Sequence, residues 1–138
     1  MNGYFPLIKQ TIEKFLPRQI NEEWIRSMLG SPSFKNHPET LTEAISKPIW
    51  EILDRGGKRW RSVLVLLIGE VMGKTAESVA DFIVVSEIIH NGTLVIDDIE
   101  DKSEMRRGKP CLHLVYPPDI AINAGNGNQK KKICFGCL

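Results

Sequence analysis

The sequence has little net charge and few cysteines. It carries 18 basic and 17 acidic residues, for a formal net charge of +1. Because both signs are mixed along most of the chain, bulk electrostatics give no support for nucleic-acid binding or for attachment to an acidic membrane. Three cysteines among 138 residues make no disulfide framework and suit a reducing compartment. We therefore expect a cytoplasmic protein with no nucleic-acid partner.

Long apolar runs and a secretory leader are also missing. The apolar run at residues 63–68 is far too short to cross a bilayer, and the N-terminus lacks the basic-then-apolar pattern of a signal peptide. We expect no transmembrane segment. A content of 42% apolar and 25% charged residues is ordinary for a soluble globular chain, and 138 residues suffice for one domain with a real core.

Helical spacing dominates the sequence up to about Glu104. Apolar residues recur at intervals of three and four over residues 7–16, which predicts an amphipathic helix that ends near Pro17. A second, short helix follows, with Asn21 as a candidate N-cap and Gly30 at its end. No strand pair and no hairpin dipeptide is expected.

Three more helices are expected between Thr42 and the acidic segment, the last of which carries that segment. One begins at Thr42, and Pro48 should kink it or delay its start. The apolar stretch 62–72 fits a buried helix or a strand by periodicity alone, and its context favours a helix. Residues 76–100 contain no proline and predict one long helix. Its many β-branched residues lower the intrinsic helix propensity, so packing on several sides must hold the helix, which places it at the centre of the fold.

The acidic segment on this long helix is the first candidate site. Asp97 and Asp101 lie four residues apart and share a helix face, whereas Asp98 points roughly a quarter turn away; His90 lies on the shared face about 10 Å below Asp97. Carboxylates of this kind can hold Mg²⁺ when phosphate oxygens of a substrate fill its other positions. The alternative is a solvated acidic helix end that is followed by a basic turn.

A glycine pair with cations makes a second candidate site. Gly56 and Gly57 let the backbone approach a ligand, and Lys58 and Arg61 supply a point charge and a planar fork suited to diphosphate. The alternative is a helix-ending glycine pair with solvated basic residues. A third possibility is a zinc site, for which the ligands would be Cys111, His113, Cys134 and Cys137. Its alternative is exposed thiols and a hydrogen-bonded histidine.

These motifs together resemble the trans-polyprenyl diphosphate synthases, which include farnesyl and geranylgeranyl diphosphate synthases. The resemblance covers residues 56–126 and rests on four pieces in order, which are Gly56-Gly57-Lys58-x-x-Arg61, His90, Asp97-Asp98-x-x-Asp101 and Arg106-Arg107-Gly108-x-Pro110-x-x-His113. It implies an all-α fold, the N-terminal part of an isoprenoid synthase bundle of helices around a central cavity. It also implies a homodimer, or a heterodimer with a related synthase.

The resemblance further implies the Mg²⁺-dependent condensation of isopentenyl diphosphate with an allylic diphosphate. Asp97 and Asp101 would bind Mg²⁺ on the allylic diphosphate, Asp98 would support them electrostatically, and Arg106 would contact that same diphosphate. Isopentenyl diphosphate would be held by Gly57, Lys58, Arg61, His90 and Arg107. Gly92 and Thr93 lie one turn before Asp97, where small residues leave room for a product of geranylgeranyl length or longer. The alternative is that Gly92 only permits tight helix packing.

The sequence departs from this family at its C-terminal end. Family members are more than twice this length and carry a second aspartate-rich motif, which has no counterpart here. Residues 1–126 are expected to form the N-terminal part of the synthase domain, and 127–138 a divergent, disordered tail; a truncated gene model, a frameshift or an alternative transcript would account for it. We expect the chain alone to have little or no activity. The alternative function is a non-catalytic partner of a full-length synthase.

Overall fold

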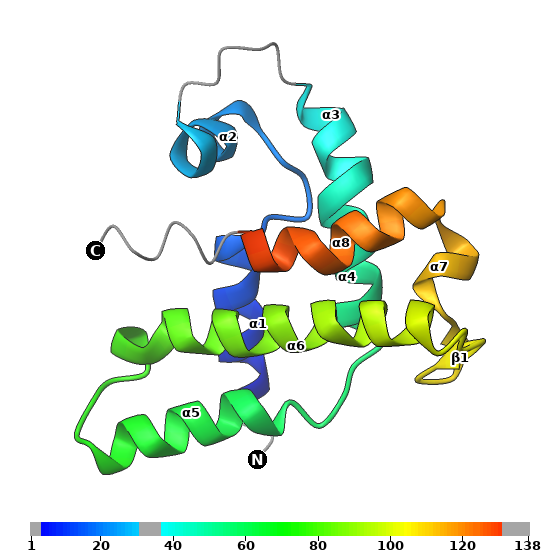
Figure 1. The fold of residues 1–138 in the computed structure, drawn as a ribbon. Helices are drawn as coiled ribbons and strands as arrows, with labels where there is room; N and C mark the ends of the chain where they lie inside the picture. The colour runs from blue at the N-terminus through cyan, green and yellow to red at the C-terminus, as the bar shows by residue number, and fades with distance from the viewer. Residues whose placement is uncertain (1–3, 31–36, 131–138) are drawn as a thin grey trace.

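The computed structural model describes residues 4–30 and 37–130, which form a bundle of helices (Figure 1). The predicted all-α class is confirmed. The helices, in chain order, are α1 (Tyr4–Phe15), α2 (Glu22–Leu29), α3 (Pro38–Leu41), the π-helical η1 (Thr42–Ser46), α4 (Lys47–Asp54), α5 (Trp60–Val71), the 3₁₀ turn η2 (Glu77–Val79), α6 (Ala80–Glu100), α7 (Leu112–Val115) and α8 (Pro118–Lys130).

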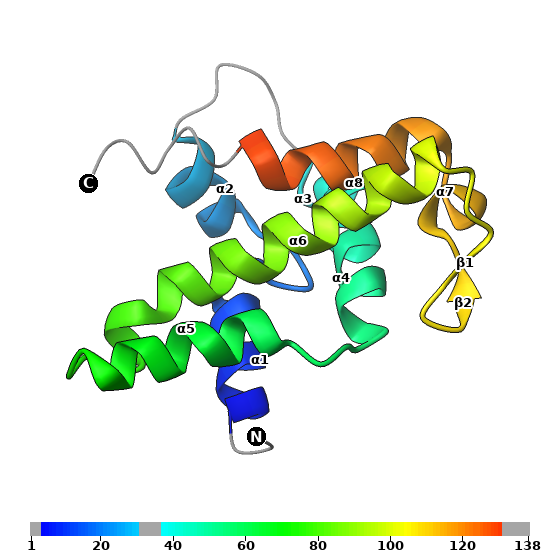
Figure 2. The same cartoon turned by 60° about the horizontal axis from the view of Figure 1, so that its bottom comes forward.

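Helix α6 runs through the middle of the molecule. It packs against α1, α4, α5, α7 and α8, and both views show neighbours on several sides of it (Figures 1 and 2). The core holds fully buried side chains from these helices, among them Ile8, Ile12, Ile52, Leu66, Ile83 and Leu112. The predicted central position of the long helix is confirmed, except that its first turn is the separate 3₁₀ turn η2.

The first two helices match their sequence signals. Helix α1 ends at Phe15, two residues before Pro17. At the start of α2 the side chain of Asn21 accepts a hydrogen bond from the Trp24 backbone N–H at 2.8 Å, which is the predicted cap. Gly30, with φ of 72°, follows the end of the helix. Helix α5 resolves the ambiguity at 62–72 in favour of a helix.

The helix before the glycine pair begins earlier than predicted. It starts at Pro38 rather than at Thr42 and continues through η1 into α4 without a break in its α-region backbone. Proline is well tolerated at the first helical position, because the N–H that it lacks has no partner there. The π turn η1 ends at Ser46, two residues before Pro48, and the Lys47 N–H reaches back five residues to the Thr42 carbonyl. This wider turn accommodates the proline ring inside the helix.

A strand pair is present where none was expected. Strands β1 (Met105–Arg106) and β2 (Lys109–Pro110) are antiparallel, with Met105 opposite Pro110. Arg107 and Gly108 form the two-residue turn with φ values of 53° and 75°. Positive φ at both positions belongs to the type I′ turn, which usually carries Asn-Gly. The prediction of no hairpin was wrong because Arg107 takes the position that asparagine usually fills.

Two further expectations concern the membrane and the C-terminal end. Residues 77–100 form a helix long and apolar enough to cross a membrane by length and composition, a test that core helices also pass. Here the segment is the central helix of the bundle, packed on several sides. Helix α8 continues to Lys130, beyond the expected domain boundary at residue 126. Residues 131–138 lie outside the described part of the chain, so the disordered tail stays a prediction there.

Candidate active site

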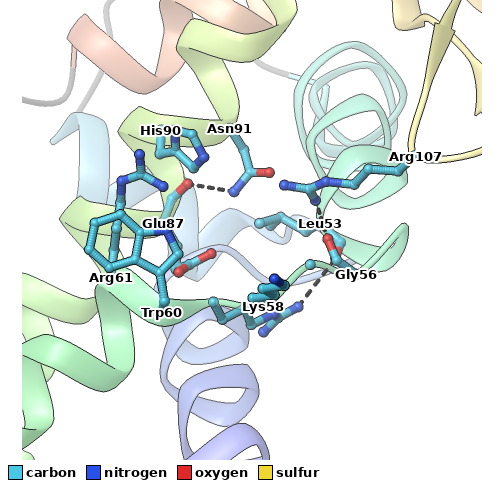
Figure 3. Close-up of a pocket in the computed structure, with 11 residues that line it drawn as sticks. Leu53, Gly56, Lys58, Trp60, Arg61, Glu87, His90, Asn91 and Arg107 are labelled. Carbon is cyan, nitrogen blue, oxygen red and sulfur yellow. Dashed lines mark hydrogen bonds between the residues drawn. The ribbon is translucent and has the colours of Figure 1, made fainter.

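A pocket lies between the end of α4, the start of α5 and the middle of α6 (Figure 3). Its volume is about 250 Å³. Its lining is mostly basic and polar, and it comprises Leu53, Gly56, Gly57, Lys58, Arg59, Trp60, Arg61, Glu87, His90, Asn91 and Arg107. All of the residues that the resemblance assigned to isopentenyl diphosphate lie in this set. The structure therefore brings together three segments that are distant in sequence.

The loop between α4 and α5 approaches the hairpin closely. Gly56 and Gly57 have φ values of 77° and 138°, which side chains rarely adopt. A Cβ atom at Gly57 would lie 3.2 Å from the Cζ and Nη2 atoms of Arg107. The glycine pair thus allows the positive φ values of the loop, and the missing side chain of Gly57 leaves room for the Arg107 guanidinium.

The start of α5 adds cations and free amides to the pocket. Helix α5 begins at Trp60, directly after the loop, and its first backbone N–H groups have no partner within the helix. The Arg61 guanidinium lies 4.6 Å from the centroid of the Trp60 ring, a cation–π contact. Arg59 donates from Nη2 to the Leu53 carbonyl at 3.2 Å. These contacts orient two arginines beside Lys58.

The hairpin turn places Arg107 over the end of α4. Its Nη1 donates to the Gly56 carbonyl and, at 3.4 Å, to the Ile52 carbonyl. The hairpin itself is held by Arg55, whose side chain is only 1% exposed and whose Nη1 donates to the Pro110 carbonyl at 2.7 Å. The position of Arg107 therefore depends on a buried arginine at the end of α4.

Helix α6 contributes two acceptor residues that sequence reasoning missed. Glu87 and Asn91 are 5% and 3% exposed. The Glu87 carboxylate accepts a hydrogen bond from the Ser62 hydroxyl at 2.7 Å, and the Asn91 Nδ2 donates to the Glu87 carbonyl at 2.7 Å. The available signal was the polar spacing of Glu87, His90 and Asn91 inside an otherwise apolar helix.

Burial and mutual repulsion shape the charges of the pocket. Burial lowers the pKa of His90, and the nearby Arg61 lowers it further. Burial also lowers the pKa of Arg107, with Glu87 acting in the opposite direction. Partial burial of Arg107 and His90 strengthens their attraction for an anionic ligand. His90, whose pKa lies below its usual 6.5, is mostly neutral at pH 7.

The acidic segment lies outside this pocket and divides into two environments. Asp97 and Asp101 are exposed. Asp98 is 1% exposed and accepts hydrogen bonds from the Arg106 Nε at 2.9 and 3.1 Å and from its Nη2. This pair raises the pKa of Arg106. Asp98 therefore fixes the base of the hairpin, whereas its two neighbours in the motif point to solvent.

The part of the chain that forms the pocket and the acidic segment matches a known protein family. Residues 42–131, well over half of the chain, match the family model for polyprenyl synthetase. The chain belongs to the polyprenyl synthetase family. Similar proteins include the geranylgeranyl diphosphate synthase of Methanosarcina mazei, with 38% identity over 89 residues that cover 64% of this chain and 28% of that protein. The synthase of the same name from Cyanophora paradoxa is 33% identical over 122 residues, which cover 87% of this chain and 34% of that protein.

Solved structures agree with this assignment. A crystal structure of geranylgeranyl pyrophosphate synthase superposes with a TM-score of 0.62 and 29% identity, covering 90% of this chain and 34% of the other. An isoprenoid synthase family member from Thermotoga neapolitana gives a TM-score of 0.61 and 32% identity, covering 91% of this chain and 43% of the other. The chain thus spans about a third of the length of its curated relatives.

The two predicted chain-length residues of this polyprenyl synthetase chain, Gly92 and Thr93, lie on α6. Gly92 is buried, and its carbonyl oxygen would lie 3.2 Å from a Cβ atom at Gly125 of α8. Gly92 therefore lies where α6 and α8 pack closely. Thr93 is half-buried, and its hydroxyl donates to the His90 carbonyl at 2.8 Å.

The zinc alternative gains no support from the described residues. Cys111 is fully buried, and burial together with the neighbouring Asp98 raises the pKa of its thiol. Within 4–30 and 37–130 no three histidine, cysteine or acidic side chains are grouped to hold a metal. Cys134 and Cys137 lie outside the described part of the chain.

Proposed function

We propose that the chain carries the two diphosphate sites of an isoprenoid diphosphate synthase of the geranylgeranyl type, acting in the cytoplasm. The observation that carries the proposal is the convergence of Gly57, Lys58, Arg61, His90 and Arg107 on one pocket of about 250 Å³. Cations scattered over a surface need no ligand to explain them, but cations gathered around one cavity favour an anion. A diphosphate of the isopentenyl class has suitable charge and size.

The pocket residues offer complementary ways to bind diphosphate oxygens. Lys58 supplies a compact charge, and Arg61 and Arg107 supply planar forks that can donate two parallel hydrogen bonds. The Gly57 backbone can approach a phosphate closely because it carries no side chain. His90, mostly neutral at pH 7, can donate from one ring nitrogen and gains a proton more readily once an anion is bound.

The allylic diphosphate is assigned to the acidic segment and Arg106. Among the described residues, Asp97 and Asp101 belong to no group of three metal-ligating side chains, but their exposed carboxylates suit Mg²⁺, which takes one or two carboxylates when substrate oxygens fill its other positions. Mg²⁺ bound there would stabilise the negative charge of the departing diphosphate. Asp98 occupies one edge of Arg106, whose Nη1 has no hydrogen-bond partner in the described chain and is available to the same diphosphate.

The proposed reaction needs no protein nucleophile. The allylic carbon–oxygen bond breaks, and its electron pair leaves with the diphosphate. The double bond of isopentenyl diphosphate attacks the allylic cation and forms the new carbon–carbon bond. The resulting cation loses one proton to an oxygen of the departed diphosphate, which restores a double bond. The residues of the chain hold both headgroups, so that the new carbon–carbon bond forms between fixed partners. Arg106 stabilises charge that grows on the leaving group.

Product length is a finer part of the proposal. Gly92 and Thr93 precede Asp97 by one turn, and small residues there would leave space for a geranylgeranyl chain or a longer one. The half-buried Thr93 is the better supported of the two, because the backbone of Gly92 packs against α8.

A second candidate function is supported by the outer face of α5. Large apolar side chains are exposed there and on the start of α6, namely Leu64, Leu67, Ile68, Val71, Met72 and Phe82. Apolar patches of this kind mark protein interaction surfaces. The chain would then be a non-catalytic partner in a heterodimer with a related synthase, or half of a homodimer.

One set of assays separates the two functions. Purified chain is incubated with Mg²⁺, isopentenyl diphosphate and an allylic diphosphate, alone and with a full-length synthase. Product formed by the chain alone supports the catalytic function, and a changed output in the mixture supports the partner function. Isothermal titration of isopentenyl diphosphate into the chain tests the site directly: Lys58→Gln should weaken binding, and Lys47→Gln, which removes only an exposed pair with Glu43, should not. The absence of binding would refute the proposed site.

A further inference from the structure

Asn91 has a polar atom that the described structure leaves without a partner. The residue is 3% exposed and lines the cationic pocket. Its Nδ2 donates to the Glu87 carbonyl one turn earlier in α6, at 2.7 Å. Its Oδ1 is buried, and no hydrogen-bond donor of the described residues reaches it. A buried acceptor without a donor costs free energy, so its position calls for a functional explanation.

The orientation of this amide is fixed by its neighbour. If the oxygen and nitrogen of Asn91 were exchanged, two oxygen atoms with no hydrogen between them would meet at the Glu87 carbonyl. The oxygen is therefore the end of the amide that is turned away from the Glu87 carbonyl. A diphosphate presents mainly acceptor oxygens, and it cannot satisfy an amide oxygen directly. The partner of this oxygen must be a donor that shares the pocket with the diphosphate.

Arg107 is the donor best placed for this role. Figure 3 shows the oxygen end of the Asn91 amide pointing toward the Arg107 guanidinium. A guanidinium carries five N–H donors, and within the described chain only Nη1 of Arg107 has hydrogen-bond partners, the carbonyls of Gly56 and Ile52. The other donors remain available on the side of the group that faces the pocket.

We propose that Asn91 is a positioning residue for Arg107, whose guanidinium it holds from the side opposite to Gly56 when a diphosphate occupies the pocket. With two fixed acceptors on its flanks, the guanidinium presents its remaining N–H groups to the diphosphate in one orientation. Glu87 partly balances the local positive charge, because its carboxylate acts on both Arg107 and His90. The inference deepens the proposed function and rests on it.

A double-mutant cycle with inorganic pyrophosphate tests the inference. Pyrophosphate affinity is measured calorimetrically for the full chain, for Asn91→Leu, for Arg107→Ala and for the double variant. Asn91→Leu should weaken binding about tenfold when Arg107 is present and leave it unchanged when Arg107 is absent. Ser86→Ala, on the same helix and outside the pocket lining, is the control and should bind as the parent does. Asn91→Ala serves as a second variant, and thermal unfolding verifies that each protein is folded.

The possible outcomes are distinct. An equal loss on Asn91→Leu in both backgrounds would show that Asn91 acts independently of Arg107, and it would overturn the inference alone. Unchanged affinity of folded Asn91→Leu and Asn91→Ala would do the same. Failure of the parent chain to bind pyrophosphate would overturn the proposed function together with the inference.

Discussion

Arg107 donates a hydrogen bond from Nη1 to the carbonyl oxygen of Gly56 and thereby ties the hairpin turn to the glycine pair. Both residues are in backbone conformations with positive φ, at 53° and 77°. The contact joins two parts of the pocket that are far apart in sequence.

Gly57→Ala should weaken both the fold and the site. Its φ of 138° disfavours any side chain, and the new Cβ would press on Arg107 at 3.2 Å. We expect a loss of about 1–3 kcal/mol in the free energy of unfolding and a weaker affinity for pyrophosphate, measured by urea denaturation and by calorimetry. Gly73→Ala is the matched control, because Gly73 has φ of 68° and a Cβ there would meet nothing within 4 Å.

The control should lose stability while its pyrophosphate affinity stays at the parent value. If both glycine variants bind equally well, the close approach of Gly57 to Arg107 does not matter for the ligand.

Replacing Asp98 should be far more costly to stability than replacing Asp97. Asp98→Asn leaves the partly buried Arg106 without its charged partner, and we expect a loss of about 2–4 kcal/mol. Asp97→Asn changes an exposed carboxylate and should alter stability by less than about 0.5 kcal/mol. Urea denaturation measures both. Equal losses in the two variants would contradict the division of the acidic segment into a structural and an exposed part.

Binding of pyrophosphate should raise the pKa of His90. In the structure burial and Arg61 hold that pKa below 6.5, and an anion in the pocket stabilises the protonated ring. The affinity for pyrophosphate should therefore increase as the pH falls from the His90 pKa of the ligand-bound chain to the lower His90 pKa of the free chain. Below the lower value, protonation of His90 gives no further gain. Titration of the His90 ring signals by NMR, with and without pyrophosphate, measures both values. An unchanged pKa would show that the ligand binds away from His90.

Removal of the buried Arg55 guanidinium should loosen the hairpin. Arg55→Met deletes the hydrogen bonds to the Pro110 carbonyl and to Glu51, and we expect a loss of about 1–3 kcal/mol and weaker pyrophosphate binding. Arg26→Met is the control: its pair with Glu22 is about three-quarters exposed and should contribute less than about 1 kcal/mol. If a folded Arg55→Met variant keeps full pyrophosphate affinity, the position of Arg107 does not depend on Arg55.

Product length offers a further test in a longer, active form of the protein. Thr93→Phe should shorten the product, because an aromatic ring would fill the space before Asp97. Gly92→Phe is also predicted to shorten it, unless its main effect is on the packing of α6 against α8, in which case thermal stability falls instead. Product chromatography and a melting curve distinguish the two effects. Unchanged products from both folded variants would refute this assignment.

Sequence spacing predicted the helices well where local signals agree. Asn21 was predicted as a cap and accepts the Trp24 N–H as expected. The hairpin was missed because its turn relies on an arginine with positive φ, for which no dipeptide signal exists. The earlier helix start at Pro38 was missed although proline at the first helical position is a local signal. The continuation of the helix past Pro48 was missed because it depends on the π turn η1, which has no sequence signature.

The residues of the candidate site could be predicted only in part from single motifs. Lys58 and Arg61 stand out beside a glycine pair, but single motifs do not reveal that Arg107 folds back onto them. That convergence depends on Arg55 and on the hairpin. Asn91 was missed although it shares with Glu87 and His90 a polar spacing inside an otherwise apolar helix, because that spacing alone does not show which of the three side chains is buried beside the pocket.

The most direct test of the account is a crystal structure of the chain with Mg²⁺ and isopentenyl diphosphate. We expect a diphosphate in contact with Lys58, Arg61, His90 and Arg107, with the Gly57 backbone beside it. A diphosphate bound elsewhere, with these side chains arranged as they are without ligand, would contradict it.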